Sequence, residues 1–179
     1  WSDEQVEGAF RFMERVYALA ALHHPKASTA KWTGAYEGKA LEIRRAAHKV
    51  LKRVGDSVER LSFNTAIAGI MEFVNALYAA EELESPAEKA AMAEAIRLLA
   101  QVLTPFAPHI SDEIANAYGQ AQVTATQPWP QFDAALVVDD VLPYAVQVNG
   151  KLKAEVRVPA AATEAEVRSA AQADDILFF

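Results

Sequence analysis

Hydrophobic residues recur every three or four positions through the first 120 residues, a spacing that predicts amphipathic helices. In the first of them, Val6, Phe10 and Tyr17 form one stripe. Pro25 is expected to end this helix, because proline disfavours helical backbone at the residue before it. We therefore expect four long helices and one short one, at about residues 3–22, 39–60, 63–82, 86–103 and 109–118.

Local signals support two of these boundaries. Ser85-Pro86-Ala87-Glu88 combines a serine N-cap, a proline at the first helical position and a glutamate at the third, which together predict a helix start. Gly119 follows the last helical pattern and suits the left-handed backbone that often ends a helix. Four aromatic residues fall at apolar positions of the pattern and are expected in the core: Phe63, Phe73, Tyr78 and Phe106.

After residue 142 the period of the pattern changes to two, which predicts strands. Hydrophobic and polar residues alternate on both sides of Asn149-Gly150, a pair that favours a tight two-residue turn. We expect a hairpin there, followed by a short helix capped by Thr163 and a third strand over residues 176–179. Because this β-β-α-β arrangement cannot enclose a core alone, the second domain is expected to be incomplete.

The fold class that follows is mainly α, with a helical bundle over residues 1–130, a linker over 131–142 and a small, truncated α/β domain over 143–179. Gln127-Pro128-Trp129-Pro130 lacks helical periodicity and predicts an extended connector. We expect Trp129 to hold this connector against the bundle.

Composition narrows the possible functions. The chain has 179 residues, 52% of them hydrophobic, and contains no cysteine, which excludes disulfides, thiol catalysis and cysteine-ligated metal sites. The lack of cysteine also fits a reducing setting, so we expect a cytoplasmic protein. No apolar run approaches the roughly 20 residues of a membrane span, so we expect no membrane contact. Trp1 is an unusual first residue and the chain stops on an apolar run, so we expect a piece of a longer protein.

The net charge of −7 conceals an uneven distribution. Residues 39–60 carry 7 basic and 3 acidic side chains, whereas residues 61–142 carry 2 basic and 11 acidic ones. On a helical projection, the cations of the second predicted helix fall within an arc of about 100°, and we expect them to be nearly unpaired: Arg45, Lys49, Lys52, Arg53 and Arg60.

Two interpretations of this basic face stay open at this point: an ordinary solvated helix face, or a surface that binds the phosphates of a nucleic acid. The acidic stretch supports a further alternative, a protein-interaction module that docks a basic partner. The basic helix has no interleaved aromatic residues, so base stacking by that helix is not indicated.

Motifs of an active site are missing from the sequence. It has no phosphate-binding glycine loop, no nucleophile elbow and no pair of metal ligands at helical spacing. Its four histidines are scattered: His23, His24, His48 and His109. We therefore expect no catalytic residue, no metal site and no cofactor within this chain.

Several short segments resemble, in the same order, the carboxy-terminal third of the bacterial leucyl-tRNA synthetases. Phe63-Asn64-Thr65-Ala66 and Pro105-Phe106-Ala107-Pro108-His109 are similar to segments of several class I synthetases for branched-chain amino acids. Val146-Gln147-Val148-Asn149-Gly150-Lys151 is the segment that points to leucine in particular.

This resemblance implies an anticodon-binding type of helical bundle that docks tRNA(Leu), followed by the start of a carboxy-terminal domain. It implies a monomeric parent enzyme, a leucine-tRNA ligase, that uses ATP with magnesium in catalytic and editing domains upstream of Trp1. The tRNA-binding residues expected here are the five helix cations, with Lys151, Lys153 and Arg157 as a second patch. The equivalent fragment of a valyl- or isoleucyl-tRNA synthetase stays an alternative.

Overall fold

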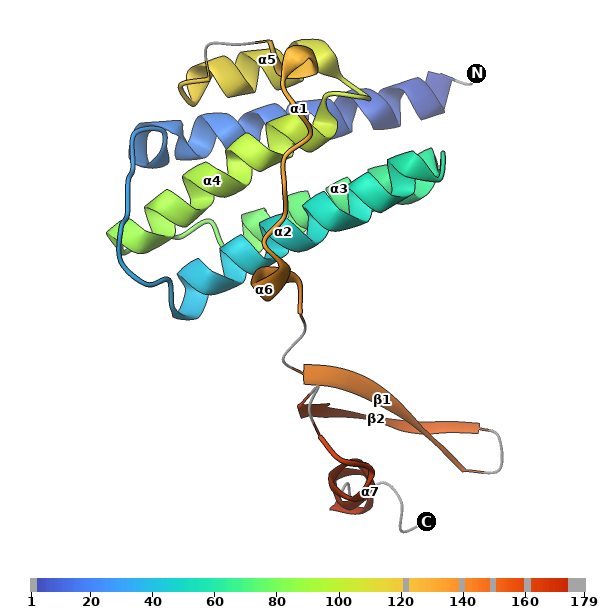
Figure 1. Ribbon diagram of the computed structural model, residues 1–179. Helices are drawn as coiled ribbons and strands as arrows, with labels where there is room; N and C mark the ends of the chain where they lie inside the picture. Colours follow the sequence, from blue (N-terminus) through green and yellow to red (C-terminus); the bar gives the residue numbers. More distant parts are fainter. Residues whose placement is uncertain (1–2, 121–122, 139–140, 149–150, 160–161, 174–179) are drawn as a thin grey trace. The chain divides into compact units, whose positions relative to one another are not determined.

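The computed structural model describes residues 3–120, 123–138, 141–148, 151–159 and 162–173. The chain divides into two compact units, residues 1–137 and 138–179 (Figure 1). The first unit contains α1 (Asp3–Ala27), α2 (Gly38–Glu59), α3 (Phe63–Ala79), α4 (Pro86–Leu103), α5 (Pro108–Ala117), the 3-10 turn η1 (Thr124–Thr126) and α6 (Ala134–Val137). The second contains β1 (Val141–Val148), β2 (Lys151–Pro159) and α7 (Glu164–Ala173).

The five predicted helices of the bundle are confirmed, with α4 at its centre. Helix α4 contacts α1, α2, α3 and α5. Its start is as predicted, because the Ser85 hydroxyl accepts a hydrogen bond from the Glu88 backbone N–H at 3.2 Å. Gly119 follows α5 with a φ of +83°, the left-handed backbone expected there. Leu51, Ile70 and Leu99, from three different helices, are almost wholly buried in the shared core.

Helix α1 runs past the proline that was expected to end it. Pro25 lies in the last turn of α1, which continues to Ala27. Tertiary contacts hold this turn, because Ala27 is fully buried and Nε2 of His24 is 3.1 Å from the Ala117 carbonyl oxygen. Near a helix end the missing proline N–H removes one backbone hydrogen bond, and these contacts offset that loss.

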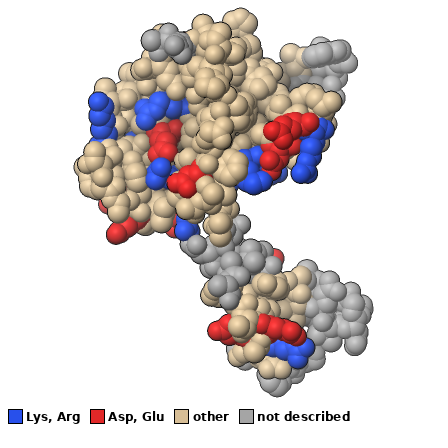
Figure 2. All heavy atoms as spheres, viewed as in Figure 1, with Lys and Arg blue, Asp and Glu red and all other residues tan. Residues whose placement is uncertain are grey.

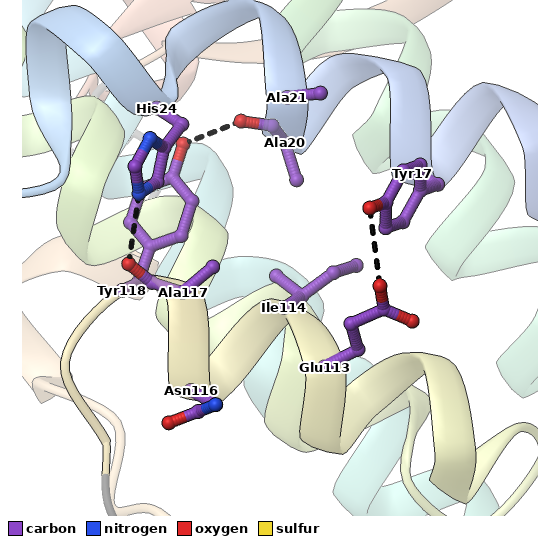
Figure 3. Close-up of a pocket in the computed structure, with 9 residues that line it drawn as sticks. All are labelled: Tyr17, Ala20, Ala21, His24, Glu113, Ile114, Asn116, Ala117 and Tyr118. Carbon is purple, nitrogen blue, oxygen red and sulfur yellow. Dashed lines mark hydrogen bonds between the residues drawn. The ribbon is translucent and has the colours of Figure 1, made fainter.

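The contact between α1 and α5 is partly polar (Figure 3). The buried Tyr118 hydroxyl donates a hydrogen bond to the Ala20 carbonyl at 2.8 Å. The exposed Tyr17 hydroxyl donates to the Glu113 carboxylate at 3.1 Å. These residues, with His24, line a cavity of about 390 Å³ between the two helices. Burial raises the pKa of Tyr118 well above its usual range, so its hydroxyl remains a donor.

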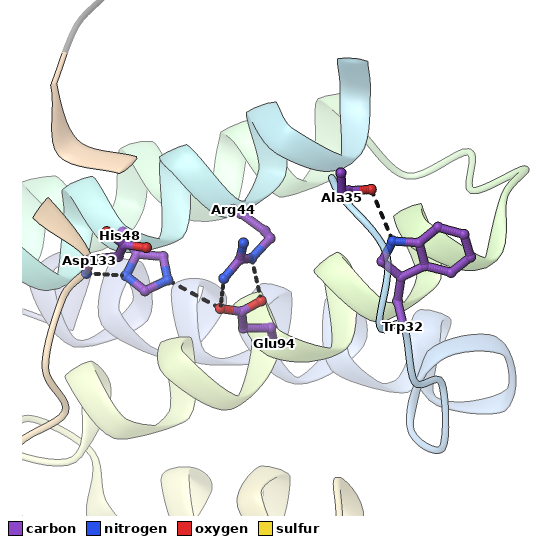
Figure 4. A network of polar contacts seen from close by, with 6 residues as sticks. All are labelled: Trp32, Ala35, Arg44, His48, Glu94 and Asp133. Carbon is purple, nitrogen blue, oxygen red and sulfur yellow. Dashed lines mark hydrogen bonds and ion pairs between the residues drawn. The ribbon is translucent and has the colours of Figure 1, made fainter. Parts of the chain in front are cut away.

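The carboxylate of Glu94 on α4 links α4 to α2 and, through His48, to the connector that precedes α6 (Figure 4). Arg44 of α2 donates to Glu94 through Nε at 2.7 Å and through Nη2 at 3.1 Å. His48, one turn further along α2, lies 3.1 Å from Glu94 through Nε2. The His48 Nδ1 accepts from the Asp133 backbone N–H at 3.0 Å, so its Nε2 carries the hydrogen that is donated to Glu94.

This network explains why part of the expected linker is ordered on the bundle. Residues 134–137 form α6, which packs on α2 directly after the bond from Asp133 to His48. Trp129 packs over Gly55 of α2, where a Cβ atom would lie 3.2 Å from the indole Nε1. The indole thus lies against the bundle, as expected from the sequence.

The aromatic core prediction is right for Phe73, which is 4% exposed, and wrong for Phe63, which is 46% exposed. Phe63 is the first residue of α3, at an end of the bundle, where the edge of Phe106 packs against it with ring centroids 6.3 Å apart. An apolar residue in the first turn of a helix has no preceding turn to cover it, and the sequence pattern does not register this.

In the second unit, β1 and β2 pair as an antiparallel hairpin, as predicted. The register shifts between Val146 and Gln147, which interrupts the simple alternation of the sequence. The cap of α7 is also as predicted, because the Glu166 carboxylate accepts from the Thr163 backbone N–H at 2.7 Å. The turn at Asn149-Gly150 and the strand expected over residues 176–179 lie outside the described residues.

Because of the Glu94 network, the free energy of unfolding should depend on pH in the acidic range. Burial raises the pKa of Glu94, but hydrogen bonds from His48 and Arg44 outweigh this and lower it from 4.5 to about 2. We predict that Glu94→Gln lowers the free energy of unfolding at pH 7 by on the order of 2–3 kcal/mol. Urea unfolding measures this difference, and Glu72→Gln, an exposed carboxylate paired with Arg53, serves as the control with little change.

The sign of the pH dependence follows from the lowered pKa. The stabilisation is complete above the ordinary value of 4.5 and is lost as the pH falls through about 2. The unfolding free energies of wild type and Glu94→Gln should therefore converge when urea titrations are repeated at decreasing pH. A constant difference between pH 7 and pH 3 would contradict a charged Glu94 in the folded protein.

Tyr118→Phe should lower the free energy of unfolding by about 1 kcal/mol, because it leaves the buried Ala20 carbonyl without this donor. Tyr17→Phe removes a hydroxyl from the same cavity at an exposed position and should leave the unfolding midpoint unchanged. Thermal unfolding of both variants measures the contrast. Equal effects at the two positions would show that burial does not set the contribution of these hydroxyls.

Candidate nucleic-acid interface

The five predicted cations lie along one side of α2 and at its carboxy-terminal end. Lys52, Arg53 and Arg60 are exposed, and Arg60 is the residue that directly follows the helix. Arg45 and Lys49 are half-buried. The opposite side of α2 carries the buried Ile43, Ala47, Val50, Leu51 and Val54, so core packing determines which way the cations face.

Neighbouring elements flank this basic side. The ammonium of Lys52 lies over the ring of Phe132, which follows the Trp129 connector, at 5.9 Å from the ring centroid. On the other flank, Arg53 packs over Gly69 of α3, where a Cβ atom would lie 3.2 Å from its Cδ. The glycine lets the arginine stem lie flat on α3 and places its guanidinium at the surface between the two helices.

The expectation that these cations are nearly unpaired is wrong, because Lys52 and Arg53 form ion pairs and neither Arg45 nor Lys49 is without a partner. Lys52 forms an ion pair with Asp56, one turn further along α2. Arg53 forms an ion pair with Glu72 of α3, in which Nη2 donates to Oε1 at 3.3 Å in addition to a shorter contact from Nη1. On the face that Figure 2 shows, lysines and arginines lie beside acidic residues rather than in one unbroken basic patch.

The sequence contained a signal for one of these pairs. Lys52 and Asp56 are four residues apart, a spacing at which helical side chains meet. The pairing of Arg53 with Glu72 depends on how α3 packs on α2, which the helical pattern does not specify. The Arg53 guanidinium, by hydrogen bonding and by its charge, lowers the pKa of Glu72, so this carboxylate is ionised at neutral pH.

Exposed ion pairs of this kind contribute about 0–1 kcal/mol to stability. A phosphate group can therefore displace Asp56 or Glu72 from its cation at small cost, and an arginine can bind it through two parallel hydrogen bonds. Asp56 and Glu72 are the acidic partners of Lys52 and Arg53 on this side of α2. The arrangement suits contacts with a polyanion, and its ion pairs hold Lys52 and Arg53 in place at the surface.

Helix α2 has two further basic residues, Lys39 and Arg44. Lys39 donates to the Glu82 carbonyl, and Arg44 does not join this surface. Arg44 turns to Glu94, and its guanidinium carbon lies 4.4 Å from the centroid of the Tyr36 ring. In the second unit, the backbone of Lys151, Lys153 and Arg157 belongs to β2, and their side chains lie outside the described residues. The second patch therefore stays a prediction.

Other kinds of site were also sought in the described parts of the chain. Over residues 3–120 and the later described segments, no group of three or more histidine or acidic side chains is arranged to hold a metal ion. Among these same residues, no helix is both long and apolar enough to cross a membrane.

Sequence and structure comparisons relate this arrangement to known proteins. Residues 40–168 match the family described as the anticodon-binding domain of tRNA ligase. The leucine–tRNA ligase of Citrifermentans bemidjiense is 40% identical over 178 residues, 98% of this chain and 22% of that protein. The leucine–tRNA ligase of Mesorhizobium japonicum is 37% identical over 182 residues, 99% of this chain and 21% of that protein.

A solved structure agrees with these relatives. The agnB2 LeuRS of Agrobacterium radiobacter K84, in a ternary complex with tRNA and LeuAMS, superposes with a TM-score of 0.79 at 31% identity. The match covers 97% of this chain and 22% of that one, so the chain spans about a fifth of the proteins it resembles. With the family match across residues 40–168, the chain belongs to the anticodon-binding domain family of tRNA ligases.

Proposed function

We propose that this chain is the tRNA-docking portion of a leucine–tRNA ligase. The observation that carries the proposal is the likeness, over 97% of the chain, to a LeuRS solved with tRNA. The curated relatives described above are leucine–tRNA ligases, which favours leucine over valine or isoleucine. The basic side of α2 supplies a surface of the right charge for a tRNA backbone.

In this proposal the cations of α2 position the tRNA and carry little sequence information. Lysine and arginine contacts to phosphates fix the orientation of a nucleic acid without reading its bases. Each phosphate that a cation neutralises releases counterions, so affinity falls as salt concentration rises. Arg45, Lys49, Lys52, Arg53 and Arg60 are the proposed backbone contacts, and Lys151, Lys153 and Arg157 extend them.

We place the chemistry of the ligase outside this chain. In this proposal, the activation of leucine with ATP and magnesium, its transfer to tRNA and the editing of errors belong to the rest of the ligase, since the chain covers 22% of the proteins it resembles. A cytoplasmic, monomeric ligase is part of the same proposal. The chain then contributes to leucylation by holding the substrate tRNA.

A titration against leucine, valine and isoleucine tRNA transcripts at two salt concentrations tests the partner. We expect tighter binding of the leucine transcript, with an affinity that falls steeply as salt rises. Equal, weak binding of all three would place discrimination in other parts of the ligase. Failure to bind any RNA at low salt would contradict the proposal and favour the protein-interaction module with its acidic surface.

Replacing Lys49, Lys52 and Arg53 together by alanine should weaken binding of the leucine transcript. The slope of log affinity against log salt should also flatten by about one unit for each lost phosphate contact. Fluorescence anisotropy across a range of salt concentrations measures both quantities. If the basic side of α2 is only solvated surface, the affinity for RNA and the salt slope should stay as in the wild type.

A charge-matched control separates local contacts from net charge. Replacing Arg11, Lys89 and Arg168 by alanine removes the same three charges from α1, α4 and α7. We expect this variant to keep the wild-type slope. If both variants flatten the slope equally, the attraction depends on net charge and not on the side of α2 that carries the cations.

A further inference from the structure

Trp32, in the loop between α1 and α2, is held in place with its ring partly exposed. Its indole N–H donates to the Ala35 carbonyl at 3.0 Å, across the bend of the loop at Gly34. One part of the ring packs against Gly34, where a Cβ atom would lie 2.9 Å from Cζ2 and 3.1 Å from Cε2. The side chain is nevertheless 40% exposed.

Figure 4 shows the indole pointing away from the Arg44–Glu94 ion pair. The hydrogen bond to Ala35 already satisfies the one polar group of the ring. The exposed part of the side chain is therefore aromatic surface, which a partner can cover. The loop backbone is fixed at its far end, where Lys39 donates to the Glu82 carbonyl and Arg44 covers Tyr36. Trp32 is therefore oriented before any partner arrives.

The surroundings of Trp32 are basic in sequence. Residues 26–36 include Lys26 and Lys31 without an acidic residue, and Glu37 follows at the N-cap of α2. Lys31 is exposed, and within the described residues no hydrogen bond or ion pair of its ammonium is found. An exposed aromatic face beside unpaired positive charge is the combination with which proteins bind single-stranded nucleic acid, because each base offers an apolar face and each nucleotide a phosphate.

Several other exposed aromatic residues of the bundle have a polar partner, pack on α2 or lie between acidic residues in sequence. Tyr17 donates its hydroxyl to Glu113, and Trp129 and Phe132 lie against Gly55 and Lys52 of α2. Phe10 is 61% exposed on α1, between Glu7 and Glu14 in sequence. Among these residues, Trp32 alone joins an oriented, exposed ring to a stretch of chain with cations and no acids.

We propose that Trp32 is a stacking platform for an unpaired base of the bound tRNA, with Lys31 near the phosphate of the same nucleotide. This inference rests on the proposed function, since it adds a base contact to a surface that otherwise binds phosphates. Stacking tolerates any base, so Trp32 strengthens binding without selecting a sequence. It recognises an unpaired nucleotide, which the cations of α2 do not distinguish from a paired one.

Two substitutions at position 32 test the platform. Trp32→Leu keeps an apolar side chain and removes the aromatic face, and it should weaken binding of the leucine transcript by about 5- to 100-fold. Trp32→Phe keeps a smaller ring but loses the hydrogen bond to Ala35, so its affinity should lie between those of the wild type and Trp32→Leu. The salt slope should stay unchanged in both variants, because no phosphate contact is lost. Phe10→Leu is the control for an exposed aromatic residue elsewhere and should bind as the wild type does.

A third variant keeps the tryptophan and moves it. The methyl group of Gly34→Ala would collide with the indole, so the ring must shift, and affinity should fall with Trp32 still present. Thermal unfolding of each variant confirms that the bundle is intact. A fall in affinity for Trp32→Leu without a matching fall for Gly34→Ala would show that orientation of the ring is unimportant, which contradicts a preformed platform.

Fluorescence gives an independent measurement. The sequence has three tryptophans, so Trp1→Phe combined with Trp129→Phe leaves Trp32 as the single reporter. Adding the leucine transcript should quench its emission with the same dissociation constant as the binding titration. Full affinity of Trp32→Leu together with unquenched Trp32 emission would overturn the platform and leave phosphate docking by α2 intact. If the wild-type protein binds no RNA at all, both the stacking platform and the proposed tRNA docking are overturned.

Discussion

Glu94 lies on α4, on the side against which α2 packs. Burial at this position opposes its negative charge, and the charge is kept because Arg44 and His48 both donate hydrogen bonds to it. Removing one partner of such a group costs more than the pair contributes, because the remaining charge would be left without compensation. The packing of α2 on α4 is thereby restricted to arrangements that keep these donors in reach.

The same network extends beyond the two helices. His48 accepts a hydrogen bond from the backbone of Asp133, which fixes the start of α6 on α2. Trp129 packs over Gly55 a few residues earlier in the chain. The connector therefore runs along one flank of the basic side of α2 and limits its extent. Through His48, Glu94 thus helps to fix the connector that borders the exposed cations of α2.

The two sides of helix α2 have different roles. One side supplies Ile43, Leu51 and Val54 to the core and Arg44 to Glu94. The other presents cations, among them Lys52 paired with Asp56 and Arg53 paired with Glu72. These exposed pairs are weak enough to exchange for phosphate, and the loop before α2 places Trp32 at the end of the helix opposite Arg60. The proposed tRNA surface thus combines charge along the helix with an aromatic ring at its beginning.

Sequence by itself determined the helices of the bundle, the hairpin and the caps at Ser85 and Thr163, because periodicity and capping are local properties that neighbouring residues specify. It also determined that the cations of α2 share one side. Tertiary structure alone decided that α1 continues through Pro25, that Phe63 stays exposed and that Arg53 pairs with Glu72. The end of α1 and the pairing of Arg53 depend on residues distant in sequence, such as Ala117 beside His24, and a helical pattern carries no information about which faces of different helices meet. The exposure of Phe63 follows from its place at the start of α3, which the pattern of apolar positions does not register.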